Sequence, residues 1–402
     1  MAELRSGNGI KAIAFYLPQF HPIPENDRAW GAGFTEWDNV KKARPLFPGQ
    51  DQPRTPKGGN HYTLPDHDVQ LWQAKLAREH RIFGFCYYHY WFGNGKTLLE
   101  KPVEAMLQWP DVDIPFCLSW ANEPWTRRWD GGGGEIIVPQ EYGGPEDGRA
   151  HFDYLLPFFR DRRYITLDGK PLLLIYKPEK IPRLKETLES WQSAARKAGF
   201  PGLCLMIQSP SWYFQPSFDM RGFDYQIRFQ PFFSMVWRDK NLVLLRIAKG
   251  LYRAARKFYM EKIFLAALSA RNRREQRNPK QEQTRLDYDA LWETTLSLPP
   301  DKRMIDCACP DWDNTPRTKF GSMLLNASPE KFAAYLTRLC RKIKAEGGMP
   351  LLFLNAWNEW GEGAYLEPDE KHGDKYLKAV RQALAEAEKE EAGRGFGDRA
   401  RV

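Results

Sequence analysis

Short apolar runs recur along this chain of 402 residues and alternate with stretches of helical periodicity. Each run has the length and continuity that are typical of a strand buried on both faces. The runs lie at residues 10–18, 82–91, 114–120, 171–177, 203–208, 224–229, 304–309 and 350–356. Helical spacing of apolar residues is found at 69–77, after the candidate N-caps Asp66 and Asp68, and at 98–107, 152–159, 184–198, 330–345 and 376–388.

This alternation predicts an α/β fold with parallel strands. Eight strands favour a closed (β/α)8 TIM barrel over an open, doubly wound sheet, and no Gly-x-Gly-x-x-Gly motif follows the first strand. We therefore predict a single barrel domain over residues 1–390, with long strand-to-helix loops. A charged, flexible tail is expected at 391–402.

A segment at about 232–300 breaks this rhythm between the sixth and seventh strands. Residues 241–270 place apolar and basic side chains at helical spacing, which predicts a basic helical insertion. Residues 240–285 hold 13 Lys or Arg and three Glu, a local charge of +10, whereas the whole chain carries +8. The basicity therefore belongs to this segment. It indicates either a solvated excursion packed on the barrel or contact with an anionic membrane surface, and without a recognition motif nucleic acid is not an expected partner.

Composition also indicates the cellular compartment that we expect for this chain. Hydrophobic residues make up 42% of the chain, enough for a large core, and the six cysteines are scattered, with four of them inside apolar runs. Such cysteines are expected to be reduced core thiols. The amino terminus lacks a signal-peptide pattern and no apolar run reaches membrane-spanning length, so we expect a cytoplasmic protein, either free or bound to a membrane surface.

Polar and aromatic residues cluster where five of the predicted strands end. In a barrel the loops after the strands share one face, so these residues are expected to meet at one mouth. The clusters are Tyr16 and Gln19; Tyr88, His89, Tyr90 and Trp91; the segment 120–130; Asp311, Asp313 and Asn314; and Trp357 to Glu362. Aromatic rings beside Asn, Asp and Glu suit a site that stacks on sugar rings and binds their hydroxyls.

Two carboxylates in the last cluster are the candidate catalytic residues. Glycosidic cleavage needs a proton donor and a second carboxylate, and Glu359 and Glu362 have the required type and proximity. Their alternative role is that of solvated loop acids. Glu123 is a third candidate acid, suited equally to binding hydroxyls, and His89 is either a core histidine or a ligand contact. No closely spaced set of ligands predicts a metal site.

Several motifs resemble a known family. They are residues 33–37 (GFTEW), 45–49 (PLFPG), 87–91 (YYHYW), 120–123 (WANE), 125–131 (WTRRWDG), 312–315 (WDNT) and 357–363 (WNEWGEG). Together they resemble the WbsX-like proteins of bacterial polysaccharide gene clusters, which are related to glycoside hydrolase family 99, the endo-α-mannosidases and endo-α-mannanases. The resemblance covers about residues 10–385 and implies a (β/α)8 barrel with a retaining mechanism that needs no metal or other cofactor.

The resemblance also implies roles for individual residues. Glu359 would deprotonate the 2-hydroxyl of the sugar, which attacks its own anomeric carbon to give a 1,2-anhydro intermediate, and Glu362 would protonate the departing oxygen and later activate water. The substrate would be an α-linked, manno-configured residue of a bacterial surface polysaccharide or O-antigen, free or lipid-linked. The expected substrate-binding residues are Tyr16, Glu36, Trp37, Tyr88, His89, Trp91, Trp120, Asn122, Glu123, Trp125, Asp130, Asp311, Asp313, Asn314, Trp357, Asn358 and Trp360.

Two other functions fit the same residues. One is a glycosyltransferase of lipopolysaccharide or O-antigen biosynthesis that uses an activated donor, for which Asp311-Trp312-Asp313 has the form of a metal-binding Asp-x-Asp motif. The same tripeptide also fits a sugar-binding cluster. The other is a carbohydrate-binding barrel without catalytic activity.

Overall fold

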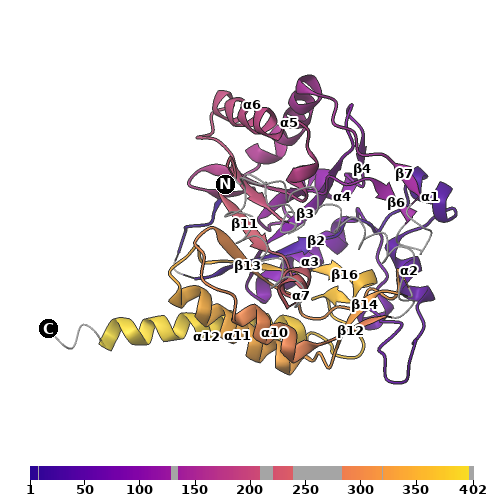
Figure 1. Ribbon diagram of the computed structural model, residues 1–402, viewed down its shortest axis with the longest axis vertical. Coiled ribbons are helices and arrows are strands. Elements are labelled where there is room, and N and C mark those ends of the chain that lie inside the picture. Colours follow the sequence, from indigo (N-terminus) through magenta and orange to yellow (C-terminus); the bar gives the residue numbers. More distant parts are fainter. Residues whose placement is uncertain (8, 128–134, 209–220, 239–282, 319, 398–402) are drawn as a thin grey trace, which may run out of the picture.

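Eight parallel strands close into a barrel in the computed structural model (Figure 1). The structure describes residues 1–402 except 8, 128–134, 209–220, 239–282, 319 and 398–402. In order around the barrel the strands are β2 (Lys11–Tyr16), β3 (Ile82–Trp91), β5 (Phe116–Trp120), β9 (Lys170–Ile175), β10 (Cys204–Ile207), β11 (Tyr225–Arg228), β13 (Met304–Ala308) and β15 (Leu351–Leu354). Closure comes from the parallel pairing of β15 with β2, and it confirms the predicted (β/α)8 barrel.

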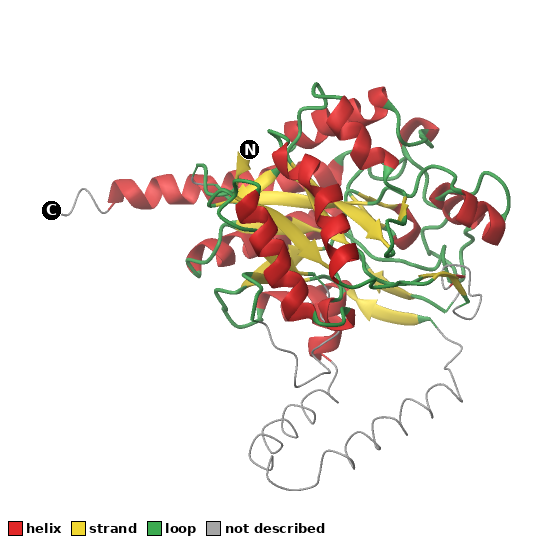
Figure 2. Cartoon of the chain, turned by 90° about the horizontal axis from the view of Figure 1, so that it is seen from above, coloured by secondary structure: helices red, strands yellow, loops and turns green. Residues whose placement is uncertain are grey.

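Helices surround the barrel, and Figure 2 shows the strands enclosed by them. The described helices are α1 (Pro24–Trp30), α2 (Glu36–Lys42), α3 (His67–Glu79), α4 (Lys101–Gln108), α5 (Pro145–Arg160), α6 (Leu184–Lys197), α7 (Phe232–Arg238), α10 (Tyr288–Leu296), α11 (Pro329–Ala345) and α12 (Lys375–Gly397). Asp66 caps α3 as predicted, since its carboxylate accepts the amide hydrogen of Val69. The sequence pattern missed α1 and α2, which at seven residues each are too short to show a helical period.

The loops between these strands and helices contain further short strands and 3-10 helical turns. They are β1 (Ala2–Glu3), β4 (Thr97–Leu98), β6 (Trp125–Thr126), β7 (Ile136–Val138), β8 (Ile165–Leu167), β12 (Thr284–Asp287), β14 (Ser322–Leu325), β16 (Asn358–Glu359), β17 (Ala364–Tyr365), η1 (Lys57–Gly59), η3 (Pro178–Lys180) and η5 (Trp360–Glu362). The pairs β6–β7 and β16–β17 are antiparallel and lie after barrel strands, so they shape the mouth.

Aromatic rings fill the inside of the barrel. Phe15 of β2 packs against Phe353 of β15 and Phe229 after β11, with ring centroids 5.2 and 5.3 Å apart. Tyr88 of β3 lies against the same Phe15 ring, at 5.7 Å. Successive side chains of a strand point to opposite faces. Because Phe15 and Tyr88 point inward, the residues next to them on β2 and β3 point outward.

The ends of the insertion lie side by side on the barrel. Helix α7 begins the predicted insertion and α10 lies near its end, and the Ser234 and Thr295 hydroxyls, buried between these helices, are 2.8 Å apart. On the return, Arg285 of β12 lies over the ring of Phe47 at 4.0 Å. The predicted helix at 241–270 lies outside the described residues.

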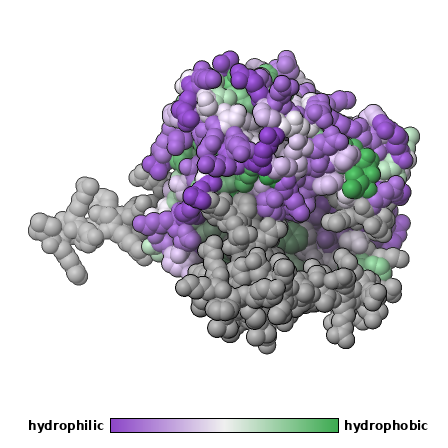
Figure 3. Space-filling model, turned by 45° about the horizontal axis from the view of Figure 1, so that its top comes forward, coloured by the Kyte–Doolittle hydropathy of each residue, from purple (hydrophilic) through white to green (hydrophobic). Residues whose placement is uncertain are grey.

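Two further expectations concern the interior and the surface. All six cysteines are free and buried, which confirms that they are core thiols. Within the described part of the chain, no helix combines the length and the apolar character that a membrane crossing requires. The face shown in Figure 3 is mainly hydrophilic where it is described, with hydrophobic residues in small patches.

Candidate active site

The turn after the eighth barrel strand carries both candidate catalytic residues. Glu359 ends β16, and Glu362 ends the single turn η5 that follows it. Both carboxylates contact the same guanidinium, that of Arg317, with Nη2 to Glu359 Oε1 at 2.5 Å and Nη1 to Glu362 Oε1 at 2.7 Å. The η5 turn therefore brings the two acids together at the mouth, as the sequence predicted.

A third carboxylate completes this cluster. Glu36, at the start of α2, accepts a hydrogen bond from Arg317 Nε at 2.8 Å. The side chains of Arg317 and Glu36 are 7% and 1% exposed, and that of Glu359 is 6% exposed, whereas Glu362 keeps 24%. Three carboxylates thus share one buried cation, and Glu362 is the member most open to a ligand. We call these four side chains the Arg317 cluster.

The sequence did not identify Arg317. It lies in the loop after the seventh strand, where the sequence showed only Asp311, Asp313 and Asn314 as candidates. A basic residue in a strand-end loop is a weak signal by itself. Its importance depends on three acids that are far from it in the sequence, the farthest 281 residues away, and only the closed barrel brings them into contact.

Burial and mutual repulsion shift the proton affinities of the two candidate acids. Burial is the largest cause and raises the pKa of Glu359 to about 8, while Arg317 opposes the rise and the neighbouring Glu362 and Glu36 add to it. Burial also raises the pKa of Glu362, and the positive charge of Arg317 again opposes the rise. Since ionising one acid makes ionising the other harder, the pair favours a state with one shared proton around neutral pH.

Two tyrosines of β3 form a wall beside Glu359. The Tyr88 hydroxyl accepts from Gln208 Nε2 at 3.0 Å, and the Tyr90 hydroxyl accepts from Gln19 Nε2 at 3.0 Å. Burial raises the pKa of both phenols, and the negative charge of Glu359 adds to the effect. Both therefore stay protonated and can donate to a bound hydroxyl or oxyanion.

The glycine of the turn is required by the cluster. A side-chain carbon built on Gly361 would collide with the Glu36 carboxylate and the Arg317 guanidinium. Any other residue at this position would have to displace the Glu36 carboxylate from its place beside the Arg317 guanidinium. The predicted motif Glu359-Trp360-Gly361-Glu362 thus has a steric reason for its glycine.

The other residues of the turn hold it in place. Asn358 is fully buried and binds the backbone of Leu17 through both ends of its amide, at 2.7 and 3.0 Å. Trp360 donates from Nε1 to Glu367 at 2.7 Å, and Trp37 of α2 packs on its ring at 5.5 Å. Trp357 is buried against Phe85. These residues position the Arg317 cluster; their burial leaves them little surface to offer a sugar.

Four expected sugar contacts point away from the mouth, which corrects their prediction. Tyr16 lies on the outer face of β2, where its hydroxyl donates to Gln73 of α3 at 2.7 Å. His89 lies on the outer face of β3, with Nε2 at 2.8 Å from Nε2 of His151 in α5. The remaining two, Trp91 and Trp120, pack on His151 as well. The alternation along β3 would have shown this, because Tyr88 and Tyr90 face inward and their neighbours must face outward.

The cluster after the third strand is mainly structural. Asn122 is fully buried, donates to the carbonyl oxygen of Lys177 at 2.7 Å and accepts its amide hydrogen at 2.8 Å. Glu123 pairs with the ammonium of the same lysine. Trp125 donates to Asn26 of α1 at 2.9 Å. Asp130 lies outside the described residues, so its predicted role remains a prediction.

The Asp-x-Asp tripeptide is engaged within the protein. Asp311 forms an ion pair with Arg54 at 2.8 Å, and Asp313 accepts hydrogen bonds from Gln50 and Gln52 at 2.9 and 3.0 Å. The Asn314 side chain accepts the amide hydrogen of Ser322. These contacts tie the loop at 50–54 to the end of β13, which leaves neither aspartate free to hold a metal-bound nucleotide. The described residues contain no group of three potential ligands suited to a metal ion.

The fold is a (β/α)8 barrel, and it is similar to the fold of solved glycoside hydrolase structures. A solved structure described as a glycoside hydrolase-like protein superposes with a TM-score of 0.53 at 13% identity, covering 94% of both chains. The GH99 endo-α-mannosidase from Bacteroides thetaiotaomicron, in complex with Bis-Tris-propane, gives a TM-score of 0.50 at 12% identity, covering 95% of this chain and 98% of that one. At such identities the similarity is one of fold.

Sequence comparison then assigns the family. The chain belongs to the WbsX family, whose profile is described as glycosyltransferase WbsX and matches residues 12–380. The uncharacterized protein WxcX from two strains of Xanthomonas campestris pv. campestris is 36% identical over 379 residues, which is 93% of this chain and 50% of the relative. The chain therefore spans about half the length of the curated relatives it matches. The family confirms the resemblance in the sequence motifs.

Proposed function

We propose that this chain is an enzyme that cleaves or transfers an α-linked, manno-configured sugar of a surface polysaccharide, with retention of configuration. The observation that supports this most directly is the pairing of Glu359 and Glu362 on one guanidinium at the mouth of the barrel. Two adjacent acids that share a proton are what glycosidic bond cleavage requires. Tyr88 and Tyr90 add hydroxyl donors beside them.

The proposed reaction keeps the proton count of the pair constant. Glu359 takes the proton of the sugar's 2-hydroxyl, and the 2-oxygen attacks the anomeric carbon as the bond to the leaving oxygen breaks. Glu362 gives its proton to that oxygen. In the second step Glu362 takes a proton from water and the water oxygen bonds to the anomeric carbon. The bond from that carbon to the 2-oxygen breaks, and Glu359 returns its proton to the 2-oxygen. Glu362 suits contact with the leaving group because its side chain is the more exposed of the two.

Arg317 has a specific task in this scheme. The mechanism requires the shared proton on Glu362, whereas the deeper burial of Glu359 favours the proton there. The contact from Arg317 to Glu359 opposes that preference, because a nearby cation stabilises the ionised carboxylate. We propose that Arg317 lowers the cost of ionising Glu359, so that Glu359 can give up its proton and act as a base when the sugar binds.

A pH profile tests the electrostatics of the cluster. Glu36 faces both acids through Arg317, and its negative charge raises the pKa of Glu359 and Glu362. Glu36→Gln removes that repulsion, so both limbs of the bell-shaped profile of kcat/KM are expected to move to lower pH. Asp68→Asn, which removes a 96% exposed carboxylate on α3, is the control and should leave both limbs in place. A Glu36→Gln profile that moves to higher pH would contradict the proposed charge coupling.

Hydrolysis and transfer share the first step of this scheme. They differ in whether water or a sugar hydroxyl opens the intermediate, and the family description as a glycosyltransferase favours including transfer. A donor bound through a metal and Asp311-Trp312-Asp313 is not supported, because both aspartates are engaged by Arg54 and the glutamines.

Incubation with an α-linked mannobiose, with and without a mannoside acceptor, distinguishes hydrolysis from transfer. No product of either kind, under conditions where the sugar binds, would support a non-catalytic binding barrel.

The basic segment is proposed to bring the mouth to an anionic membrane that carries a lipid-linked glycan. Its charge of +10 over residues 240–285 supports this proposal. The chain also returns to the barrel close to the mouth, because Arg285 lies over Phe47, and Phe47 is three residues before Gln50 in the loop that borders the mouth. Deleting residues 240–285 is expected to abolish sedimentation with phosphatidylglycerol vesicles and to leave turnover of a soluble mannobiose unchanged. Equal sedimentation of both proteins would remove the membrane proposal.

A further inference from the structure

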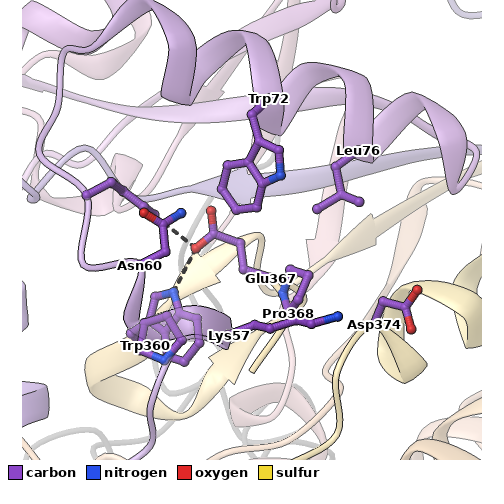
Figure 4. Close-up of a pocket in the computed structure, with 10 residues that line it drawn as sticks. Lys57, Asn60, Trp72, Leu76, Trp360, Glu367, Pro368 and Asp374 are labelled. Carbon is purple, nitrogen blue, oxygen red and sulfur yellow. Dashed lines mark hydrogen bonds between the residues drawn. The ribbon is translucent and has the colours of Figure 1, made fainter. Parts of the chain in front are cut away.

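A pocket lies beside η5, on the flank of the barrel. It has a volume of about 370 Å³, which is within the range of about 300–1,000 Å³ for small-ligand sites. Four segments far apart in the sequence form it: the η1 loop, α3, η5 and the loop at 367–374. Figure 4 shows Trp72 and Leu76 of α3 on one side, Lys57, Pro368 and Asp374 on the other, and Glu367 between them. We call this the α3 pocket.

Trp72 has no structural role that the described residues reveal. Its side chain is 36% exposed, one of the few large hydrophobic residues on the described surface. Leu76, one turn later, packs on the core, but Trp72 belongs to neither described hydrophobic cluster. No described aromatic ring stacks on it. An exposed indole over a polar pocket offers an apolar face that a ligand can cover.

Polar groups opposite the indole are available to a ligand. Neither the Lys57 ammonium nor the Asn60 amide is hydrogen-bonded or ion-paired to any residue the structure describes. Asp374 pairs with Lys378 at 2.9 Å, so its charge is balanced. The pocket therefore combines an apolar face with neutral or singly charged hydrogen-bonding groups, the pattern that matches a sugar ring with an apolar C–H face and a rim of hydroxyls.

The pocket is built before any ligand binds. Its floor is Glu367, only 3% exposed, which accepts from Gln73 Nε2 at 2.6 Å, Trp360 Nε1 at 2.7 Å and the Tyr62 hydroxyl at 2.9 Å. The η1 loop is fastened to the opposite wall, because Lys57 donates its amide hydrogen to Pro368 at 3.0 Å and Gly58 to Glu370 at 2.6 Å. A fastened pocket loses little conformational freedom on binding.

We propose that the α3 pocket is a second sugar-binding site, which holds a neutral residue of the glycan outside the reacting site. It lies next to the mouth, since Trp360 contributes to its wall and the same η5 turn ends at Glu362. A polysaccharide bound at both places is held more tightly than one bound at the mouth alone. The proposal rests on the proposed function for the kind of sugar, and the two can fail separately.

The test counts binding sites in a protein that does not turn over its ligand. In Glu362→Gln, titration calorimetry with α-linked mannobiose is expected to show two sites, and adding Trp72→Ala should remove one by weakening it about tenfold or more. Trp72→Phe, which keeps an aromatic face, is the matched control and should retain both. In the otherwise native chain, Trp72→Ala should leave kcat/KM for mannobiose unchanged and raise KM for a long mannan.

Each other outcome has a definite meaning. A single site in Glu362→Gln that persists after Trp72→Ala would overturn the α3 pocket and leave the proposed function standing. Two sites that both survive Trp72→Ala would also overturn it. If mannobiose binds at neither site, both proposals are overturned, because neither the mouth nor the α3 pocket then binds this sugar.

Discussion

Glu362→Gln is expected to lose activity only on substrates whose leaving group needs a proton. For an α-linked mannobiose, kcat/KM should fall by about 100- to 10,000-fold, the usual contribution of a general acid. For the corresponding glycosyl fluoride, first-turnover release of fluoride should stay within about tenfold of the wild type, because fluoride departs without protonation. Rapid-quench sampling followed by detection with a fluoride electrode measures the fluoride released in the first turnover. This release precedes the reaction of the intermediate with water.

Glu359→Gln provides the contrast. Without its base the 2-hydroxyl keeps its proton, so attack on the anomeric carbon should fail for both substrates, by the same factor of about 100 to 10,000. The two glutamines are close in shape to the acids they replace, and both can still contact Arg317. A result in which the fluoride rescues Glu359→Gln but not Glu362→Gln would show that the roles are reversed, in agreement with the deeper burial of Glu359.

Arg317→Gln is expected to have the largest combined effect on stability and activity. It leaves three carboxylates, two of them nearly buried, without their shared cation, and breaking a buried ion pair on one side costs about 3–5 kcal/mol. We expect the free energy of unfolding to fall by about 3 kcal/mol, less than the full cost because the acids can take up protons. Urea denaturation at neutral pH measures this loss.

The same variant should change the pH dependence of the reaction. Without the guanidinium both acids hold their protons more tightly, so the limbs of kcat/KM should move to higher pH, opposite to the shift in Glu36→Gln. Arg317→Lys is the matched control: a single ammonium can meet one or two of the acids, and the shift should be intermediate. An Arg317→Gln protein that is less stable but keeps the wild-type profile would reduce Arg317 to a structural residue.

Much of the fold was predictable because it depends on local periodicity. All eight barrel strands were located within a few residues, since each is a short apolar run closed off by polar residues, and the strand count then favoured closure. The two shortest helices near the amino terminus escaped, although α2 carries Glu36. A helix of seven residues completes only about two turns, too few for its buried face to show in the sequence.

The site was predictable in part, for the same reason. Glu359 and Glu362 are close in sequence and one turn of η5 joins them, so their pairing was local. Glu36 and Tyr88 were expected near them and lie there. His89 and Trp91 were grouped with Tyr88 although they point to the opposite face of β3; period-two alternation would have separated them.

By itself, then, the sequence determined the barrel and the position, at the end of the eighth strand, of the turn that carries Glu359 and Glu362. Only the tertiary structure decided which cation they meet and which aromatic residues share their side of the strand. Arg317 and Glu36 are 281 residues apart, and no local pattern relates them. Parallel closure of β15 onto β2 sets the end of the eighth strand beside the end of the first, and that contact places α2, Arg317 and η5 around one buried charge.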